Sequence, residues 1–386
     1  MATIFLGAQD EGKGAVVSHA TPQLPAFFPG KHNAEHSIVS NDVIFDFHML
    51  PSGLMCPSCM SLIGSGVVFH EPSFFKELET LEAKGLTGVR ERIVVSDRCH
   101  VNLDLYAAVY KLTLPFLAGR GIGHSYSTKA ARSGIRVHEI FDQESFEKKL
   151  RKLAGECMKR IGDLLKYDVE DEIQPFQDYR SKPAEFCVDA VHLVHMMQKH
   201  NAKILVEGAN ALLLDVDYGT YPRVTSSNTG LGGVFTGLAI HSKKIESNGQ
   251  KVGVVKAYRP TEPRTMAEIG AKLRTIASGR EWGATTGRMR RCGWIDLCVL
   301  KYSTAVNHYT CLNPSKLDIL ERCEVVYHEI EEWQQPTTHT KTFEDLPKQA
   351  KAYVKLIEGH CGVPIAWIGT GPGREGMIIR PIPAGT

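Results

Sequence analysis

Short apolar runs alternate with amphipathic stretches along most of the chain. Five of the apolar runs predict buried strands, because β-branched residues are frequent in them and polar residues or glycine follow them. These runs are TIFLG (3–7), GVVFH (66–70), RIVVSD (92–97), KILVEG (203–208) and VGVVKAY (252–258). Apolar residues at helical spacing predict helices over 142–165, 183–200 and 343–359. An initial proline and a final glycine predict a further helix from Pro72 to Gly85.

The alternation of strands and helices favours an α/β fold with a large, mostly parallel central sheet and flanking helices. Ligands of such folds bind at the carboxyl ends of the strands, and glycine-rich or polar motifs follow several of the predicted strands. The chain has no internal repeat, low-complexity tract or proline-rich linker that would mark a domain boundary.

Composition and charge narrow the class of protein. Lys and Arg number 45 and Asp and Glu number 43, which leaves a formal net charge of +2. The net charge therefore creates no strong positive potential that would attract nucleic acid or an anionic membrane. No apolar run is long enough to predict a membrane span, and ten scattered cysteines without a paired framework are typical of a reduced protein. We expect a soluble cytoplasmic protein with no nucleic-acid or membrane partner.

The motif GAQDEGKG (7–14) directly follows the first predicted strand. Its spacing matches a phosphate-binding loop, although Gly14 stands where Ser or Thr would bind Mg²⁺. Converging backbone N–H groups, a following helix N-terminus and Lys13 would all favour an anion. Taken alone, the motif fits an exposed strand-to-helix turn equally well.

Two further segments carry candidate nucleotide chemistry. The segment GREWGATTGRMRRCGW (279–294) sets four arginines among glycines and threonines, which suits bidentate binding of carboxylate or phosphate. A basic surface loop is the alternative. In SKLD (315–318), Asp318 can accept two hydrogen bonds from guanine, whereas a charged helix end is the commoner explanation of four such residues.

Cysteine and histidine groups give only weak metal signals. CPSC (56–59) is one CxxC pair without a second, so zinc would lack ligands. His192, His195 and His200 lie near one face of a predicted helix. A core or boundary helix explains their spacing better than a metal site does.

Nine segments together resemble adenylosuccinate synthetase over nearly the whole chain. They are DEGKG (10–14), HNAEHS (32–37), FDFHMLPSG (45–53), GRGIGHSY (119–126), KAARSGIRV (129–137), VEGANALLLDVDYGTYPRVTSSNT (206–229), GATTGRMRRCGWID (283–296), KLD (316–318) and WIGTGPGR (367–374). The resemblance implies a single interwoven domain over 1–386 with inserted small subdomains and a P-loop-like GTP site.

The resemblance also implies a reaction, the GTP-dependent ligation of IMP and L-aspartate to adenylosuccinate with release of GDP and phosphate. This is the first committed step from IMP to AMP in purine nucleotide biosynthesis. Asp10 and His36 match the catalytic residues: the aspartate removes the N1 proton of IMP, and the histidine assists transfer of the γ-phosphate of GTP to O6. L-aspartate then displaces phosphate. One Mg²⁺ per subunit is implied as cofactor, with Asp10 and Glu35 as its ligands.

Matching positions imply three sets of binding residues and a homodimer. The GTP-binding set is Gln9, Asp10, Glu11, Gly12, Lys13, Gly14, Glu35, His36, Ser37, Arg290, Lys316, Leu317, Asp318, Gly369, Thr370 and Gly371. The IMP-binding set is Asp10, Lys13, Asn33, His36, Ala118, Arg132, Asn210, Thr225 and Arg288. The aspartate-binding set is Ala284, Thr285, Thr286, Gly287, Arg288, Met289 and Arg290. In the implied homodimer, Arg132 crosses the interface to the IMP of the partner subunit.

Several departures from the family pattern lie beside the expected ligands. A Trp-Gly pair is missing before Asp10, Glu35 replaces a glycine beside the metal, and Leu117 and Ala118 replace a threonine pair that binds the IMP phosphate. Short stretches are also missing after VKAY (255–258) and LDIL (317–320). Two other hypotheses therefore stay open: a catalytically impaired paralogue that acts as a nucleotide-binding or regulatory dimer, and a mispredicted coding sequence of the active enzyme.

Overall fold

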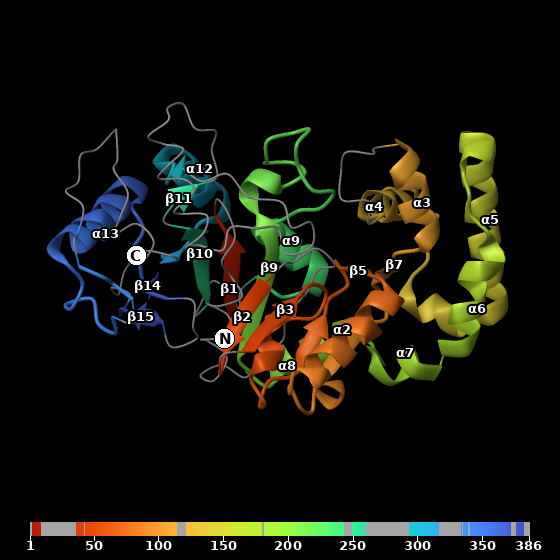
Figure 1. The fold of residues 1–386 in the computed structure, drawn as a ribbon, viewed down its shortest axis with the longest axis horizontal. Coiled ribbons are helices and arrows are strands. Elements are labelled where there is room, and N and C mark those ends of the chain that lie inside the picture. The colour runs from red at the N-terminus through yellow and green to blue at the C-terminus, as the bar shows by residue number, and fades with distance from the viewer. Residues whose placement is uncertain are drawn as a thin grey trace.

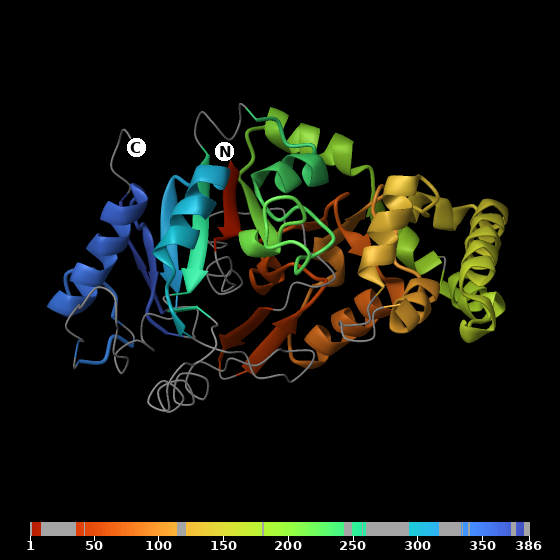
Figure 2. The same cartoon turned by 90° about the horizontal axis from the view of Figure 1, so that it is seen from above.

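The fold is given by a computed structural model (Figures 1 and 2). The structure describes residues 2–8, 36–41, 43–113, 121–179, 181–242, 249–256, 258–259, 293–315, 333, 335–338, 340–371 and 376–381. Both views show an elongated molecule, with helix α5 (Gln143–Ile161) at one end and helix α13 (Lys348–Cys361) at the other.

A four-stranded sheet with the order β13–β10–β1–β9 lies between these ends. All three neighbouring pairs are parallel. The strands are β1 (Ala2–Gly7), β9 (Ile204–Ala211), β10 (Gln250–Lys256) and β13 (Cys311–Ser315). Because β1 has partners on both sides and is buried along its whole length, its sequence is mostly apolar and does not alternate between apolar and polar residues. The α/β fold class with a parallel central sheet is therefore confirmed.

The sheet is extended toward the C-terminal end by strand β14 (Trp367–Gly369). A parallel bridge joins Leu312 of β13 to Ile365, two residues before β14. Strand β15 (Met377–Ile379) then pairs with β14 in the antiparallel direction. Helix α12 (Leu297–Asn307) packs against α13 at this end.

Several smaller sheets and strand pairs accompany the central sheet. A parallel three-stranded sheet has the order β4–β6–β8. Its strands and the remaining pairs are β4 (Ser61–Ile63), β6 (Ile93–Ser96), β8 (Cys187–Val188), β5 (Val68–Phe69) with β7 (His100–Val101), β2 (His36–Ser40) with β3 (Val43–Phe47), and β11 (Tyr258–Arg259) with β12 (Gly293–Trp294).

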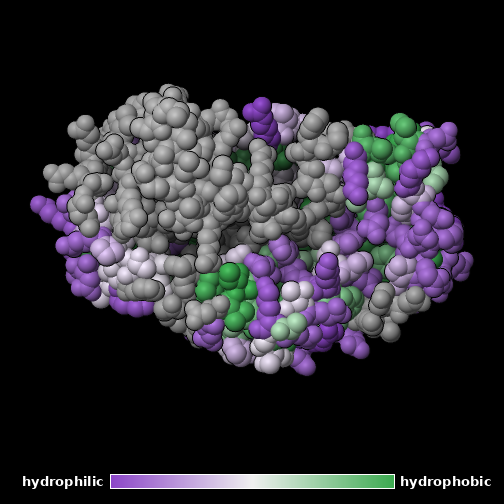
Figure 3. Space-filling model, viewed as in Figure 1, coloured by the Kyte–Doolittle hydropathy of each residue, from purple (hydrophilic) through white to green (hydrophobic). Residues whose placement is uncertain are grey.

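The remaining described helices lie mainly on the side of β9 that leads to α5 (Figure 1). They are α2 (Glu71–Ala83), α3 (Asp104–Thr113), α4 (Ile122–Ala131), α6 (Val169–Tyr179), α7 (Ser181–Phe186), α8 (Ala190–Lys199) and α9 (Leu231–Leu238). Hydrophilic residues cover most of the surface around α5 and α6 (Figure 3), as expected for helices with one face in water. Within the described ranges, none of the helices has the length and apolar character that a bilayer crossing requires.

Most elements predicted from the sequence are present in the structure. The runs 3–7, 92–97, 203–208 and 252–258 overlap strands β1, β6, β9 and β10. The run 66–70 contributes only the two residues of β5. Helix α2 ends just before Gly85, which adopts φ +95, so a residue without a Cβ ends this helix as predicted.

Two helix predictions are wrong in their extent. The stretch 183–200 is divided between α7 and α8 because Cys187 and Val188 pair with β6 instead of continuing the helix, so sheet pairing overrides the local helical pattern. The stretch predicted from residue 343 becomes helical only at Lys348. Pro347 precedes it, and a proline disfavours helical geometry in the residue before it.

Two large apolar clusters meet at a pair of glycines. One cluster packs on the central sheet and includes Leu238 at the end of α9, and the other fills the helical end and includes Val67. Between them, the N–H of Gly66 donates to the carbonyl oxygen of Gly237 over 3.1 Å. A Cβ on Gly66 would lie 2.8 Å from the Cα of Gly237. The two backbones can therefore approach this closely only because residue 66 has no side chain.

We expect the substitution Gly66→Ala to lower the free energy of unfolding by about 1–3 kcal/mol, since the added methyl group meets backbone that cannot rotate away. Gly155→Ala is the matched control, because Gly155 lies inside α5 and a Cβ there has no neighbour within 4 Å. That variant should gain up to about 1 kcal/mol. Urea unfolding of both variants measures the difference, and an unchanged stability of Gly66→Ala would contradict the proposed tight contact.

His100, the first residue of β7, is buried beside two cationic side chains. It is 7% exposed, and its Nδ1 has no hydrogen-bond partner within the described part of the chain. Burial, followed by the charges of Lys129 and Arg136, lowers its pKa to about 4, although Glu139 opposes this shift. His100 is therefore neutral in the folded protein at neutral pH.

This depressed pKa makes the stability of the fold depend on pH in a definite direction. The ordinary pKa of histidine is 6.5, so the unfolded chain binds a proton between about pH 6.5 and pH 4 that the folded protein does not. Stability is therefore lost as the pH falls through this window. In His100→Asn, the drop in Tm between about pH 7 and pH 5 should be smaller than in the wild type. The exposed His192→Asn is the control, and an identical drop in all three proteins would exclude this role of His100.

Candidate active site

The candidate active site lies along one edge of the central sheet. Because β9, β1, β10 and β13 are parallel, their carboxyl ends share this edge, and the bridge at Ile365 gives β14 the same direction. The residues that follow β1 begin the glycine-rich segment 9–14, and those that follow β13 begin with Lys316. The parallel topology therefore sends several of the predicted ligand segments to a common edge.

Asn210 lies near the end of β9, in a backbone conformation that residues with a side chain seldom adopt. Its φ is +55 and the residue is 6% exposed. A Cβ added to Gly7 at the end of β1 would lie 2.5 Å from the carbonyl oxygen of Asn210. The last residues of β1 and β9 are thus in direct backbone contact, and the glycine at position 7 makes this possible.

The segment after β9 folds back so that Thr225 lies over the start of the same segment. The N–H of Thr225 donates to the carbonyl oxygen of Leu214 over 2.8 Å. Further along, the hydroxyl of Thr229 donates to the carbonyl oxygen of Ala211 over 3.0 Å. The loop that carries Thr225 is therefore closed onto the end of β9, which carries Asn210.

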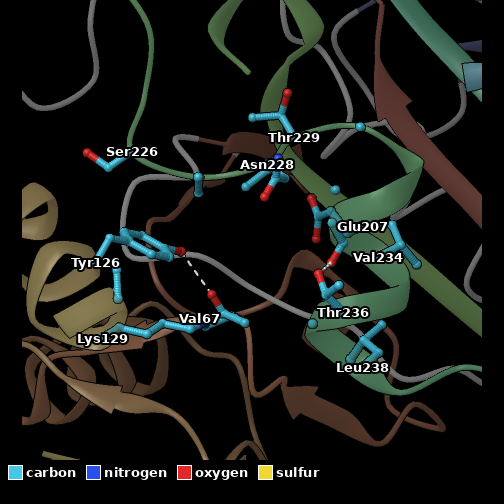
Figure 4. A pocket seen from close by; sticks show the side chains of 18 residues that line it. Val67, Tyr126, Lys129, Glu207, Ser226, Asn228, Thr229, Val234, Thr236 and Leu238 are labelled. Atoms are coloured by element: carbon cyan, nitrogen blue, oxygen red, sulfur yellow. Dashed lines mark hydrogen bonds between the residues drawn. The ribbon is translucent and has the colours of Figure 1, made fainter. Parts of the chain in front are cut away.

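A cavity of about 430 Å³ opens beside this loop (Figure 4). Five segments contribute its walls: α4, the turn before β5, strand β9, the loop 226–230 and helix α9. The lining residues are Gly66, Val67, Tyr126, Lys129, Ala130, Glu207, Gly208, Ala209, Ser226, Ser227, Asn228, Thr229, Gly230, Gly233, Val234, Thr236, Gly237 and Leu238. The sequence neighbours of Asn210 and Thr225 thus line one cavity together with the helix that ends at Arg132.

Hydroxyl groups, one lysine and one glutamate are the main polar side chains of this cavity. The Tyr126 hydroxyl donates to the carbonyl oxygen of Gly66 over 2.8 Å (Figure 4), and burial raises its pKa to about 12 although a hydrogen bond with Ser227 opposes the shift. Burial and the charge of Arg136 lower the pKa of Lys129. Such a cavity offers hydrogen bonds and a single positive charge to a polar ligand.

Glu207 supplies the buried carboxylate of the cavity wall. It is 2% exposed, and its Oε2 accepts hydrogen bonds from the N–H of Ser52 over 3.2 Å and from the Ser52 hydroxyl over 3.0 Å. Ser52 belongs to the segment FDFHMLPSG, whose Phe45 and Phe47 are buried as the sequence predicts. Glu207 therefore fastens that segment to strand β9.

The other end of the sheet edge holds residues 369–371. Thr370 is fully buried, its N–H donates to the carbonyl oxygen of Gly376 over 2.8 Å, and its hydroxyl donates to the carbonyl oxygen of Thr340 over 3.0 Å. Strand β13 ends next to β14, since Leu312 donates to Pro364 and accepts from Ala366. Strand β13 therefore ends at Ser315 on the same side of the sheet as Thr370.

Some of the residues predicted for the site lie within the described structure. These are His36 at the first position of β2, Ser37, Arg132, Asn210, Thr225, Gly369, Thr370 and Gly371. The Ser37 hydroxyl donates to Asp46 over 2.6 Å. Arg132 caps α4, with φ +62 and an exposed side chain.

The remaining predicted residues lie outside the described part of the chain. They are Gln9, Asp10, Glu11, Gly12, Lys13, Gly14, Asn33, Glu35, Ala118, Ala284, Thr285, Thr286, Gly287, Arg288, Met289, Arg290, Lys316, Leu317 and Asp318. The strands that lead into them place only the points at which these segments begin. The last described residue before Gln9 is Ala8, and the last before Lys316 is Ser315.

The described residues contain no group of three or more His, Cys, Asp or Glu side chains able to hold a metal ion. Cys56 and Cys59 are both buried thiols. His192 and His195 on α8 and His200 at its C-terminal end are exposed, so this helix is a boundary helix whose imidazoles face water. The weak metal signals in the sequence are accordingly not supported.

Sequence reasoning missed three contributors to the site. Tyr126 and Lys129 line the cavity from α4, and the sequence pattern of a helix gives no sign of this. Glu207 was detectable, because an acid inside the apolar run KILVEG is costly to bury unless it is hydrogen-bonded.

Comparison with known proteins places the chain in a family. The family model described as adenylosuccinate synthetase matches residues 4–323 and 314–378. The adenylosuccinate synthetase of Pyricularia oryzae is 55% identical over 428 residues, which cover 98% of this chain and 100% of the relative. That of Neurospora crassa is 54% identical, and the match covers 98% of each chain.

A solved structure agrees with these sequence relationships. The fully ligated adenylosuccinate synthetase of Plasmodium falciparum superposes with a TM-score of 0.88 at 32% identity, covering 98% of this chain and 99% of that one. The alignment with the Pyricularia oryzae protein is 428 residues long whereas this chain has 386. The relative therefore has at least 42 residues without a counterpart here, as the shortened segments in the sequence indicate. On these grounds, the chain belongs to the adenylosuccinate synthetase family.

Proposed function

We propose that this chain is an active adenylosuccinate synthetase, which uses GTP to join IMP and L-aspartate in the cytoplasm. The observation that carries the proposal is the 55% identity over the full length of a curated relative. Catalytic segments are retained within this similarity, including Asp10, Lys13 and His36. No feature of the described structure favours a binding protein without activity.

The order of strands supports a particular arrangement of the two nucleotides. Guanine recognition is assigned to the segments after β13 and β14, phosphate binding to the segment after β1, and IMP binding to the segment after β9. From β13 to β1 there are two strand spacings, or roughly 10 Å. A nucleoside triphosphate can span this distance. Its γ-phosphate would then lie near the end of β1, next to the segment after β9 that is assigned to IMP.

Positioning and charge would provide most of the catalysis, as in other phosphoryl transfers. We assign Asp10 as the base that takes the N1 proton of IMP, and His36 as the donor that stabilises the transferred phosphoryl group. Lys13 and Arg290 would neutralise charge on the GTP phosphates, and Arg288 would bind L-aspartate and IMP. Burial of these groups in a closed site would strengthen each interaction.

We further propose one Mg²⁺ per subunit, held by Asp10 and Glu35 together with phosphate oxygens. Oxygen donors of this kind are the ligands that Mg²⁺ prefers, so the chemistry of the donor set fits the ion. When bound, Mg²⁺ supplies charge neutralisation at the β- and γ-phosphates. The family pattern has a glycine at the position of Glu35, so this carboxylate would add a direct ligand.

A homodimer with shared sites completes the proposal. Arg132 ends α4 one turn beyond Lys129, which lines the cavity, and its side chain is exposed. An exposed arginine at a helix end suits binding of a phosphate on another subunit. We therefore assign Arg132 to the IMP of the partner subunit.

The first test is the reaction itself. The purified protein should form adenylosuccinate, GDP and phosphate from IMP, L-aspartate and GTP, detected by chromatography. Asp10→Asn should lower kcat by about 10²- to 10⁴-fold, since it removes the general base. Asp163→Asn, an exposed carboxylate beyond the end of α5, should leave kcat unchanged. Calorimetric binding of IMP or GTP by the wild type without turnover would support the nucleotide-binding alternative instead.

The shared site can be tested by mixing two inactive proteins. Arg132→Ala and Asp10→Asn should each be inactive alone, because each lacks one component of every site. If Arg132 acts across the interface, one of the two sites in a mixed dimer is intact, so random 1:1 mixing should restore about a quarter of wild-type activity. If Arg132 acts within its own subunit, one site of the mixed dimer lacks Arg132 and the other lacks Asp10. Neither site is then intact, so no activity returns.

A further inference from the structure

Asp215 is a buried carboxylate with no assigned role in the family resemblance. It follows a short 3-10 turn, Leu212–Leu214, at the start of the loop that returns to Thr225. The residue is 1% exposed. Burying a charge here is costly unless it is fully hydrogen-bonded. The hydrogen bonds of this carboxylate therefore have to offset the cost of its burial.

Each oxygen of Asp215 binds a different part of the loop. Oδ1 accepts from the N–H groups of Asp217 and Tyr218 over 2.9 and 3.1 Å. Oδ2 accepts from the N–H of Gly230 over 3.1 Å, from the N–H of Thr229, and from the Thr229 hydroxyl over 3.3 Å. The carboxylate therefore clamps the beginning of the loop to its end, directly before α9.

The hydrogen bonds, rather than a cation, stabilise this charge. Burial by itself would raise the pKa of Asp215, but the backbone N–H groups of Thr229, Asp217, Tyr218 and Gly230 outweigh it and lower the pKa. None of the salt bridges found between described residues includes Asp215. The carboxylate is therefore ionised at neutral pH, and its charge binds backbone dipoles.

The clamp brackets the residue assigned to the IMP phosphate. Next to Asp215 in sequence, the carbonyl oxygen of Leu214 accepts from the N–H of Thr225, and the N–H of Val216 donates to the carbonyl oxygen of Ser227 over 3.3 Å. Four positions after Thr225, Thr229 is held by Asp215 itself, and Figure 4 shows its hydroxyl turned away from the cavity. The wall 226–230 and Thr225 therefore share a single anchor.

We propose that Asp215 is a positioning residue for the IMP site, which sets the height of Thr225 and of the cavity wall above β9. It contacts no substrate in this assignment. The proposal rests on the proposed function, because IMP binding at Thr225 belongs to that function. It assigns to Asp215 control over IMP affinity without a corresponding effect on GTP.

Asparagine cannot replace this aspartate without loss. Both oxygens of Asp215 accept from N–H donors, so in Asp215→Asn either orientation of the new amide would point its NH₂ group at such donors. One half of the clamp would therefore open while the shape of the side chain stays nearly the same.

Glu172 provides a matched control elsewhere in the fold. It is 7% exposed and accepts from the N–H groups of Asp104 and Leu105 over 2.6 and 3.1 Å, and from the Tyr167 hydroxyl. These contacts anchor the start of α3, away from the loop of Thr225. Glu172→Gln therefore removes a similarly buried carboxylate that binds backbone N–H groups.

The decisive experiment compares Asp215→Asn, Glu172→Gln and the wild type. Asp215→Asn should raise the KM for IMP by about tenfold to a hundredfold, with the KM for GTP within about twofold, because a small displacement of Thr225 weakens only IMP contacts. Hydrogen exchange of the ligand-free proteins should show faster exchange at Thr229 and Gly230 in Asp215→Asn, and at Asp104 and Leu105 in Glu172→Gln.

Equal changes in the KM of IMP and GTP, or unchanged exchange at Thr229 and Gly230, would overturn the proposal. If the wild type is inactive, the proposed function fails, and calorimetric IMP affinity with the same exchange data still tests the clamp. If Asp215→Asn does not fold, Thr229→Val removes one donor to Oδ2 and should raise the KM for IMP several-fold. An unchanged IMP affinity in Thr229→Val would then count against the clamp.

Discussion

The parallel pairing of β9, β1, β10 and β13 is the constraint on which the rest of this structure depends. Strands in the middle of such a sheet are buried on both faces, which requires continuous apolar runs and leaves few polar side chains within the strands. Ligand-binding groups are therefore displaced to the segments that follow the strands. Because all strands point the same way, those segments meet at one edge. The strand order β14–β13–β10–β1–β9 then sets the order along that edge of the segments proposed to bind guanine, the GTP phosphates and IMP.

Loops at such an edge need anchors, and this protein uses buried carboxylates for the purpose. Glu77 accepts from the three consecutive N–H groups of residues 48–50, Glu207 holds Ser52, and Asp215 holds the end of its own loop. Each carboxylate satisfies backbone donors that would otherwise lie unpaired in the interior. Replacing any of them leaves donors without partners, which costs more than the loss of one ordinary hydrogen bond. The site is thus supported by charges that do not themselves touch a substrate.

This chain has the family fold although it is shorter than its relatives. At least 42 residues of the Pyricularia oryzae relative have no counterpart here, yet the chain superposes on a ligated family member with a TM-score of 0.88. This chain has the central sheet, two large apolar clusters and the Gly66–Gly237 contact. Losses in loops are compatible with such a core because loop length has a small effect on the free energy of closure. The departures that bear on function are those in the predicted ligand-binding segments, such as Glu35 and Ala118.

The sequence by itself determined the fold class, three of the four strands of the central sheet, the helix that ends before Gly85, and the family. These depend on local periodicity, on turn residues and on long matching segments such as 206–229. All of these features can be recognised from the sequence alone. Only the tertiary structure decided that Cys187 and Val188 leave a helix to pair with β6, because the gain from sheet pairing comes from residues far away in the sequence. Only the tertiary structure also revealed that Tyr126 and Lys129 share a cavity with Glu207, and that Asp215 clamps the loop of Thr225. Such contacts join distant segments, and their energies depend on burial and geometry that no local pattern records.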